Sequence, residues 1–378
     1  MQRKRIIVLG ASGSIGRQTL DAIRAFPGRF ELAGAQARMN YGALAAIASE
    51  FPSARLCLSG EELPSGAELP RGCLRGGEGL ASLIATAEAD MVVNGIAGSG
   101  GLEPSILALE AGKDLALANK ESVVMGWSLL EAAAAKSGSR IIPVDSEHAA
   151  VFQLINRIGR GDIEDITITA SGGAFLNRPL ADLAKVTPDE AAAHPNWKMG
   201  KKISIDSASL ANKGLEVIEA SRLFNMPPER VKVLIHPQSL VHALVRAKDG
   251  SLYMNVSAPD MRLPILNALA YPEVLSSQFG RLELAGKSLE FRDPDPARFP
   301  LLPLAYKALA SGYGATVAYN AADEVAVAAF EAGRIAFPDI PNIVEAALSG
   351  DLPRQAVSLQ AVFEQDSAAR RRALSAIE

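Results

Sequence analysis

The chain contains very little cysteine: Cys57 and Cys73 are its only two, and both lie in the first fifth of 378 residues. Two cysteines cannot form a disulfide framework, and they make a cysteine-based metal site improbable. We therefore expect reduced thiols, a reducing compartment and a cytoplasmic location.

The chain also lacks long apolar runs and long basic runs. No apolar stretch approaches the ~20 residues that span a bilayer, and "MQRKRIIVLG" passes directly from charge into an apolar strand, so we expect no membrane span and no signal or transit peptide. The net charge of −4, with no long basic run outside "RRR" near the C-terminus, argues against nucleic-acid and membrane partners. A function in small-molecule chemistry is therefore favoured over one that needs such partners.

What the chain does contain is enough apolar sequence, 48%, for two or three domains. In the first 140 residues, short apolar runs such as "RIIVLG" and "FELAGAQ" alternate with helical stretches such as "SIGRQTLDAIRAF". This rhythm is typical of a doubly wound parallel α/β sheet, a Rossmann-like fold. We expect it over residues 1–144.

The pattern then changes. "DIEDITITAS", "KKISIDS", "VKVLIH" and "SLVHALVRAKDGSLYMNVS" are strand-like, the last with a hairpin turn at Asp249-Gly250, and predict a central α+β domain over residues 145–271. Proline and charge rise in residues 272–298, which we expect to be a linker. The helical pattern of residues 299–378 predicts a small bundle.

A glycine motif lies between the first expected strand and helix, where Gly10, Gly13 and Gly16 are spaced as G-x-x-G-x-x-G. Such glycines let the backbone approach a pyrophosphate, whose charge meets free amides at the helix N-terminus. A merely tight turn is the alternative, but the strand-before, helix-after context favours dinucleotide binding. The second expected strand ends at Arg38 without a carboxylate, which favours a 2′-phosphate and hence NADPH.

Two carboxylates, Asp145 and Glu147, follow an apolar run in "IIPVDSEHAAVF". In an extended segment, side chains at i and i+2 point to the same side, so we expect these two to converge while Ser146 points away. Like charges that close repel unless a cation or a proton lies between them. None of the four histidines has zinc-like spacing, which favours an oxygen-only site for Mg²⁺ or Mn²⁺; solvent-facing carboxylates are the alternative.

A phosphate site is predicted in "ISIDSASLANKGLEV", where we expect a strand to give way to a helix at Ser207, with Asn212, Lys213 and Glu216 on one helical face. A serine cap, first-turn amides and a lysine suit a phosphoryl group. A capped surface helix is the alternative. It is less favoured because "ITASGGAF" supplies a second strand running into Ser171 and two glycines, whose amides can face the same anion.

A polar, proline-bearing segment at about 172–201 carries Trp197, with Met199 beside Gly200. A tryptophan in so polar a segment is either a small core anchor or the underside of a lid that closes over a ligand. The sequence leaves both interpretations open.

Taken in order, these motifs resemble the 1-deoxy-D-xylulose 5-phosphate reductoisomerase family over nearly the whole chain. The resemblance rests on long, specific segments: "LGASGSIG", "LANKES", "VDSEH", "SGGAF", "HPNWKMGKKISIDSASLANKGLE", "IHPQSLVH", "DMRLPI" and "NAADE". It implies an NADPH-binding N-terminal domain, a central catalytic domain with dimer contacts, a linker and a helical bundle. It also implies a homodimer and inhibition by fosmidomycin-type phosphonates.

The activity implied by the resemblance is conversion of 1-deoxy-D-xylulose 5-phosphate, a phosphorylated sugar, to 2-C-methyl-D-erythritol 4-phosphate by rearrangement and hydride transfer from NADPH. Asp145, Glu147 and Glu216 would share one divalent cation, Mg²⁺ or Mn²⁺, with Co²⁺ as a further candidate. The implied catalytic residues are Lys120, Glu147 and His194. The implied substrate contacts are Ser146, Glu147, Ser171, His194, Trp197, Ser207, Asn212, Lys213 and Glu216.

The implied cofactor contacts are Gly10, Ala11, Ser12, Gly13, Ser14, Ile15, Gly16, Ala37, Arg38, Met39, Asn119, Lys120, Glu121 and Gly200. Three departures from the family are local. Members usually have proline where Ala174 stands, glycine where Ser257 stands, and Gly/Asn-Lys/Arg-Asn/Ser in place of Ala37-Arg38-Met39. The first two bear on lid flexibility, and the third bears on how the adenosine phosphate is held.

Two other functions compete with this one. A related NADPH-dependent oxidoreductase could act on a different phosphorylated sugar, and a non-catalytic NADPH-sensing regulator could use the same fold. Retention of three carboxylates together with the Ser-Asn-Lys set argues against the regulator, because a sensor has no use for a metal site.

Overall fold

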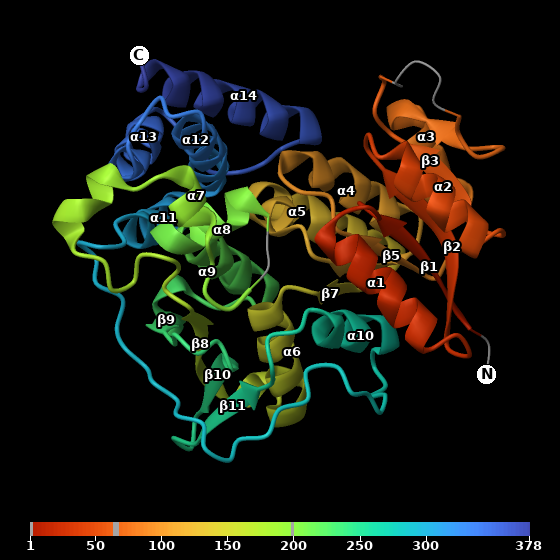
Figure 1. Cartoon of the computed structure of the whole chain (residues 1–378), viewed down its shortest axis with the longest axis horizontal. Helices are drawn as coiled ribbons and strands as arrows, with labels where there is room; N and C mark the ends of the chain where they lie inside the picture. Colours follow the sequence, from red (N-terminus) through yellow and green to blue (C-terminus); the bar gives the residue numbers. More distant parts are fainter. Residues whose placement is uncertain (1–2, 63–67, 198–199) are drawn as a thin grey trace. The chain divides into compact units, whose positions relative to one another are not determined.

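The computed structural model describes residues 3–62, 68–197 and 200–378; Met199 lies outside them. The chain divides into two compact units, whose elements are labelled in Figure 1. Unit 1 comprises Met1–Ser122, Ser128–Ala149 and Asp260–Gly280, and unit 2 comprises Val123–Trp127, Ala150–Pro259 and Arg281–Glu378. Each unit has its own sheet.

Unit 1 is built on a parallel sheet, in which the described residues form seven strands in the order β4-β3-β2-β1-β5-β6-β7. The strands are β1 (Lys4–Leu9), β2 (Phe30–Ala37), β3 (Arg55–Leu58), β4 (Leu74–Arg75), β5 (Met91–Asn94), β6 (Asp114–Leu117) and β7 (Ile141–Pro143). Central strands β1 and β5 are apolar and buried, as a sheet covered on both faces requires. The strand order reverses between β1 and β5, which is where such sheets bind ligands.

The helices of unit 1 connect these strands. They are α1 (Ser14–Ala25), α2 (Tyr41–Glu50), α3 (Gly76–Thr86), α4 (Leu102–Glu110), α5 (Lys120–Ser137), the first turn of α6 (Ser146–Ile158) and α10 (Arg262–Ala270), with a 3-10 turn at Ser99–Gly101. α10 packs on α1, and Figure 1 draws the two side by side. Gly126 interrupts α5 with non-helical backbone angles. The doubly wound α/β fold predicted from the sequence is confirmed.

Unit 2 contains a mixed sheet in the order β11-β10-β8-β9. Its strands are β8 (Ile163–Ala170), β9 (Val231–Ile235), β10 (Val241–Ala247) and β11 (Leu252–Val256). β8 and β9 are parallel, whereas β10 is antiparallel to both of its neighbours. Gly250 has φ +89°, so the predicted Asp249-Gly250 turn needs glycine at its second position. The predicted α+β region is confirmed.

Helices complete unit 2. They are the rest of α6, α7 (Pro188–Ala192), α8 (Lys201–Ser209), α9 (Ala211–Leu223), α11 (Leu301–Ser311), α12 (Tyr313–Glu331), α13 (Ile340–Ala347) and α14 (Leu359–Ser375), with 3-10 turns at Arg160–Asp162, Leu180–Lys185, Pro228–Arg230 and Phe337–Asp339. α12 contacts α11, α13 and α14, and Figure 1 shows α12, α13 and α14 together in blue. The predicted C-terminal helical bundle is confirmed.

One predicted strand is wrong. "KKISIDS" was expected to be extended, yet residues Lys201–Ser209 form α8. The alternating Ile203 and Ile205 fit a strand locally, but this segment is buried among helices, with Ile205 in the core that also holds Tyr319. Tertiary packing overrides a weak local preference in such a place. Across the described part of the chain, no helix is both long and apolar enough to cross a membrane.

Candidate active site

The glycine motif forms the turn from β1 into α1. Gly10 has φ +73°, and a Cβ there would lie 2.6 Å from Gly95 O; a Cβ on Gly16 would lie 2.3 Å from Gly10 O. Both positions therefore require glycine. Gly13 is the N-cap of α1, whose first turn carries neither a side-chain cap nor an acidic residue. Uncapped amides at a helix N-terminus suit a pyrophosphate.

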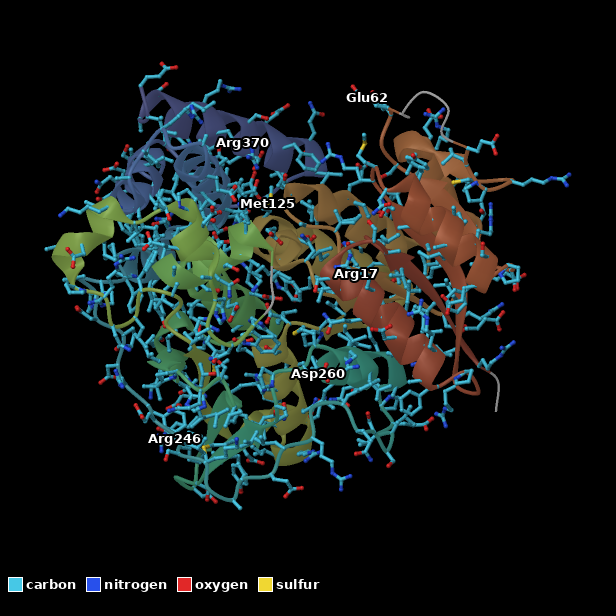
Figure 2. The ribbon with its side chains drawn as sticks, viewed as in Figure 1. Arg17, Glu62, Met125, Arg246, Asp260 and Arg370 are labelled. Atoms are coloured by element: carbon cyan, nitrogen blue, oxygen red, sulfur yellow. The ribbon has the colours of Figure 1, made fainter. Side chains whose placement is uncertain are left out.

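Two polar side chains hold this loop in place. Gln36, buried at the end of β2, accepts a hydrogen bond from Gly10 N (2.8 Å) and donates to Ser59 Oγ (2.6 Å). Arg17, labelled on α1 in Figure 2, donates from Nη1 to Ser12 O (2.8 Å). The lack of a carboxylate at this strand end is visible in the sequence, whereas the support that Gln36 gives the glycine loop is visible only in the fold.

Arg38 follows β2 directly, and its side chain is exposed. Because β1 and β2 are paired in parallel, with Leu9 opposite Gln36, their carboxyl ends meet at one edge of the sheet. Arg38 therefore lies at the same edge as the glycine loop. Met39 is also exposed, whereas Ala37 is buried.

The turn from β6 into α5 carries three predicted cofactor residues. Asn119 caps α5, since its Oδ1 accepts from Ser122 N (3.0 Å), and its Nδ2 donates to Glu121 Oε2 (2.8 Å). Glu121 Oε1 accepts from Gly98 N (3.2 Å). This network orders the first turn of α5, where Lys120 is the first helical residue.

Asp145 and Glu147 lie at the end of β7, but their predicted extended geometry is wrong. α6 begins at Ser146, so Glu147 belongs to a helical first turn. The two side chains still converge, because each offers an oxygen within 4.8 Å of the other. Ser146 was expected to point away, yet its Oγ donates to Glu147 Oε2 (2.5 Å).

Lys120 pairs with this carboxylate group: its Nζ lies 2.5 Å from Asp145 Oδ2, and both side chains are largely buried. Burial raises the pKa of Asp145, but the charges of Lys120 and His148 lower it by more, so the pKa lies well below its usual range. A carboxylate that is largely buried and held ionised, as Asp145 is, does not fit the solvent-facing alternative. With Glu147 it forms an oxygen donor set suited to a hard divalent cation.

His148 is a neighbour of this site that the sequence analysis did not assign. One of its ring nitrogens lies within 4.8 Å of an Asp145 oxygen. The available signal was its position three residues after Asp145, at the start of a helix, where i and i+3 side chains are neighbours. Zinc-type spacing, the test applied to the four histidines, does not detect such a contact.

In unit 2, the loop after β8 lies against α8. Gly173 has φ +67°, and a Cβ there would lie 2.4 Å from Ala208 Cα and 2.6 Å from Ser207 O. The two segments predicted to bind phosphate are therefore adjacent. Ser207 is not the predicted helix N-cap: it lies in the last turn of α8, and its Oγ donates to Ile203 O (2.8 Å).

The predicted helical face on α9 is confirmed. Asn212 Nδ2 and Lys213 Nζ both donate to the carboxylate of Glu216. The surface-helix alternative is wrong, because Lys213 and Glu216 are only 3% and 1% exposed. Leu210, with φ +58°, separates α8 from α9 and so brings the two helices into a sharp turn.

His194 ties the predicted lid to the Ser171 loop. Its Nδ1 accepts from the backbone amides of Asn196 (3.1 Å) and Trp197 (3.0 Å), so Nε2 carries the proton and donates to Ser171 Oγ (2.8 Å). Burial lowers the pKa of His194, which favours this neutral form. The Trp197 ring meets His242 edge-on, and His242 Nε2 lies 3.0 Å from Ser257 Oγ.

Comparisons with known proteins give consistent results. A family model described as 1-deoxy-D-xylulose 5-phosphate reductoisomerase matches residues 6–126, and two models of its C-terminal domain match residues 141–224 and 256–372. A reductoisomerase from Treponema denticola is 46% identical, covering 100% of this chain and 98% of the relative. One from Paraburkholderia phymatum is 45% identical, covering 100% and 96%.

Solved structures agree. The reductoisomerase from Zymomonas mobilis in complex with NADPH superposes with a TM-score of 0.91 at 39% identity, covering 100% of both chains. A second, in complex with NADPH, fosmidomycin and magnesium, gives 0.90 at 38% identity, covering 99% of this chain and 98% of that one. With three matching family models and full-length relatives above 40% identity, this chain belongs to the 1-deoxy-D-xylulose 5-phosphate reductoisomerase family.

Proposed function

We propose that this chain is an NADPH- and divalent-metal-dependent oxidoreductase that converts 1-deoxy-D-xylulose 5-phosphate to 2-C-methyl-D-erythritol 4-phosphate, the committed step of non-mevalonate isoprenoid biosynthesis. The observation that carries the proposal is the composition of one sheet edge in unit 1. The glycine loop follows β1, and the carboxylates Asp145 and Glu147 follow β7 of the same parallel sheet. Hydride transfer and metal chemistry can share such an edge.

The test is a direct assay. Purified protein with Mg²⁺ should oxidise NADPH when the deoxyxylulose phosphate is added, and mass spectrometry should detect the methylerythritol phosphate. Other phosphorylated ketoses should give far slower NADPH consumption. NADPH binding without turnover of any sugar phosphate would favour the regulator instead.

The cofactor is NADPH, which supplies hydride when bound. The proposed contacts at the sheet edge are the loop of Gly10, Ala11, Ser12, Gly13, Ser14, Ile15 and Gly16, the strand end of Ala37, Arg38 and Met39, and the helix start of Asn119, Lys120 and Glu121, with Gly200 from unit 2. Free amides of α1 would hold the pyrophosphate, and Arg38 would hold the 2′-phosphate.

Arg38→Ala should raise the KM for NADPH about tenfold or more, because a charged hydrogen bond contributes ~1.5–3 kcal/mol and each tenfold change is ~1.4 kcal/mol. The KM for NADH should hardly change, since NADH has no 2′-phosphate. Steady-state kinetics with both cofactors measures this. Arg55→Ala, on neighbouring β3 and also exposed, is the control. Equal weakening of both cofactors by Arg38→Ala would rule out the 2′-phosphate role.

The proposed metal ligands are Asp145, Glu147 and Glu216, with Mg²⁺ or Mn²⁺ as the ion and Co²⁺ as a further candidate. Carboxylate oxygens alone fit hard ions of this kind, and Asp145 is held ionised by its neighbours. A bound divalent ion supplies Lewis acidity toward the carbonyl and hydroxyl oxygens of the substrate. Lys120, buried beside Asp145, adds positive charge next to these oxygens.

The proposed substrate contacts lie largely in unit 2. Ser171, Ser207, Asn212 and Lys213 would hold the phosphate and polar chain, with Ser146 near the metal end and His194 and Trp197 closing over the substrate. The adjacency of the Gly173 loop to α8 and the bond from His194 to Ser171 support this grouping. Holding both ends of the substrate favours a two-step rearrangement.

Lys213→Ala should raise the KM for the phosphorylated substrate by roughly 10- to 150-fold, from the loss of a charged hydrogen bond of ~1.5–3 kcal/mol. Ser207→Ala should give a smaller rise of the same kind. Because Lys213 also pairs with Glu216, the metal dependence of each variant should be titrated alongside. An unchanged KM for Lys213→Ala would remove this lysine from the phosphate site.

Trp197 is proposed to be the underside of a lid. Its fluorescence should change when NADPH and fosmidomycin are added together, because ligand closure alters the surroundings of its ring. Trp127 also emits, so Trp197→Phe is the necessary comparison, and that variant should lose most of the response. If Trp197→Phe retained the whole response, the contact of Trp197 with His242 would be that of a core anchor.

We further propose a cytoplasmic homodimer that fosmidomycin-type phosphonates inhibit. Cys57 and Cys73 are free thiols, which suits a reducing compartment. β11 is an edge strand with Leu252, Tyr253 and Met254 exposed, and such an edge favours a second copy of the chain. Met254→Lys should shift sedimentation toward monomer. A wild-type protein that sediments as a monomer would contradict the dimer.

A further inference from the structure

A charge cluster next to Ser207, made of one partly exposed lysine and two buried carboxylates, has no part in the proposed site. Lys202 Nζ, near the start of α8, donates to Asp206 Oδ2 one turn later (2.6 Å) and to Asp323 Oδ2 on α12 (2.7 Å). Asp206 and Asp323 are only 2% and 0% exposed. Two buried carboxylates from different helices therefore converge on one ammonium group.

Asp323 depends strongly on this contact. Its Oδ1 is buried and has no hydrogen-bond partner among the described residues, so Lys202 is the cation that compensates its charge. Tyr319, one turn earlier on α12, donates to Leu301 O (3.1 Å), and burial together with Asp323 and Asp206 raises its pKa well above the ordinary value. A buried carboxylate is costly without its partner, so this pairing fixes α12 and α8 to each other.

α8 connects this charge cluster to the predicted phosphate site. Asp206 is followed directly by Ser207, whose carbonyl lies where a Cβ on Gly173 would collide with it. The position of α8 therefore sets the distance between Ser207 and the Ser171 loop. Lys202 directly follows Lys201, the first residue of α8 and the last residue of the predicted lid.

We propose that Lys202, Asp206 and Asp323 are positioning residues through which the C-terminal bundle sets the geometry of the phosphate subsite. This inference rests on the proposed role of Ser207 in binding phosphate. The three residues act through α8 and do not touch the substrate. Their loss displaces Ser207 relative to Gly173 and weakens recognition of the phosphoryl group while leaving the glycine loop of unit 1 unchanged.

The experiment compares Asp323→Leu, which removes both charge and acceptor, with Asp323→Asn, which keeps an acceptor oxygen for Lys202. Glu331→Gln, an exposed carboxylate at the end of the same helix, is the matched control. Asp323→Leu should raise the KM for the phosphorylated substrate about tenfold or more, since a shift of ~1 Å in a positioned group can cost ~100-fold. Its KM for NADPH should rise far less, because every proposed cofactor contact except Gly200 lies in unit 1. Asp323→Asn should recover most of the loss in substrate recognition, and Glu331→Gln should show no loss.

Binding of inorganic phosphate, followed by phosphorus NMR, needs no turnover and so separates this inference from the proposed function. Phosphate should bind Asp323→Leu more weakly than wild type by a similar factor. If Asp323→Leu does not fold, Lys202→Met takes its place, with the same expected rises. Wild-type phosphate affinity in a folded variant would overturn the positioning role. So would equal rises in the KM for NADPH and the KM for substrate that follow a lower Tm.

Discussion

Glu147→Gln should lower kcat/KM by roughly 1,000-fold and weaken binding of the divalent ion, since a neutral amide is a poor ligand for a hard cation and the charge stabilisation is lost with the ion. A carboxylate oxygen of Glu147 lies within 4.8 Å of one of Asp145, and the neighbours of Asp145 keep that carboxylate ionised. Asp145→Asn and Glu216→Gln should behave alike. EDTA should abolish wild-type activity, and added Mg²⁺ or Mn²⁺ should restore it.

Calorimetric titration with Mn²⁺ measures the ion directly, and circular dichroism checks the fold of each variant. Glu131→Gln provides the matched control, because this exposed carboxylate lies on α5 away from the sheet edge. It should leave both metal affinity and turnover unchanged. Full activity in EDTA, or wild-type rates in any two of the three site variants, would contradict the metal site.

The dinucleotide-binding features could be predicted because they are local. Alternating apolar runs and helical stretches encode a parallel sheet, and Gly10 and Gly16 mark places where a Cβ has no room. The face shared by Asn212, Lys213 and Glu216 was equally accessible, since a helical repeat places residues three and four apart together.

What the sequence could not predict depends on packing between distant segments. Residues 201–207 look extended locally, and only their burial among helices makes them α8. Lys202 and Asp206 are four residues apart, but the bond from Lys202 to Asp323 joins positions 121 residues apart. The geometry predicted for Asp145 and Glu147 was wrong for a smaller reason. α6 already begins at Ser146, so Glu147 lies in a helical turn and not in the extended segment that the i and i+2 spacing suggested.

Lys120→Met should lower kcat by ~100- to 1,000-fold, the usual cost of losing one preorganised electrostatic contact in the transition state. Methionine is unbranched and fills a similar space, so packing around this buried position changes little. Unlike Glu147→Gln, Lys120→Met should not weaken the binding of the metal ion. Lys120 Nζ lies 2.5 Å from Asp145 Oδ2 and competes with a divalent ion for that carboxylate, so its removal should leave Mn²⁺ affinity unchanged or tighter.

The competition between Lys120 and a divalent ion for Asp145 also affects the stability of the fold. Without Lys120 or a metal ion, Asp145 is a largely buried carboxylate that has lost its cation, which destabilises the fold. Lys120→Met should therefore have a lower Tm than wild type in EDTA and regain much of the difference when Mn²⁺ is added. Lys136→Met, exposed at the other end of α5, should show neither change. Equal losses of metal affinity and kcat in Lys120→Met would mean that Lys120 acts only by arranging the metal ligands, because a lysine that stabilises the reacting oxygens directly affects turnover without weakening the ion.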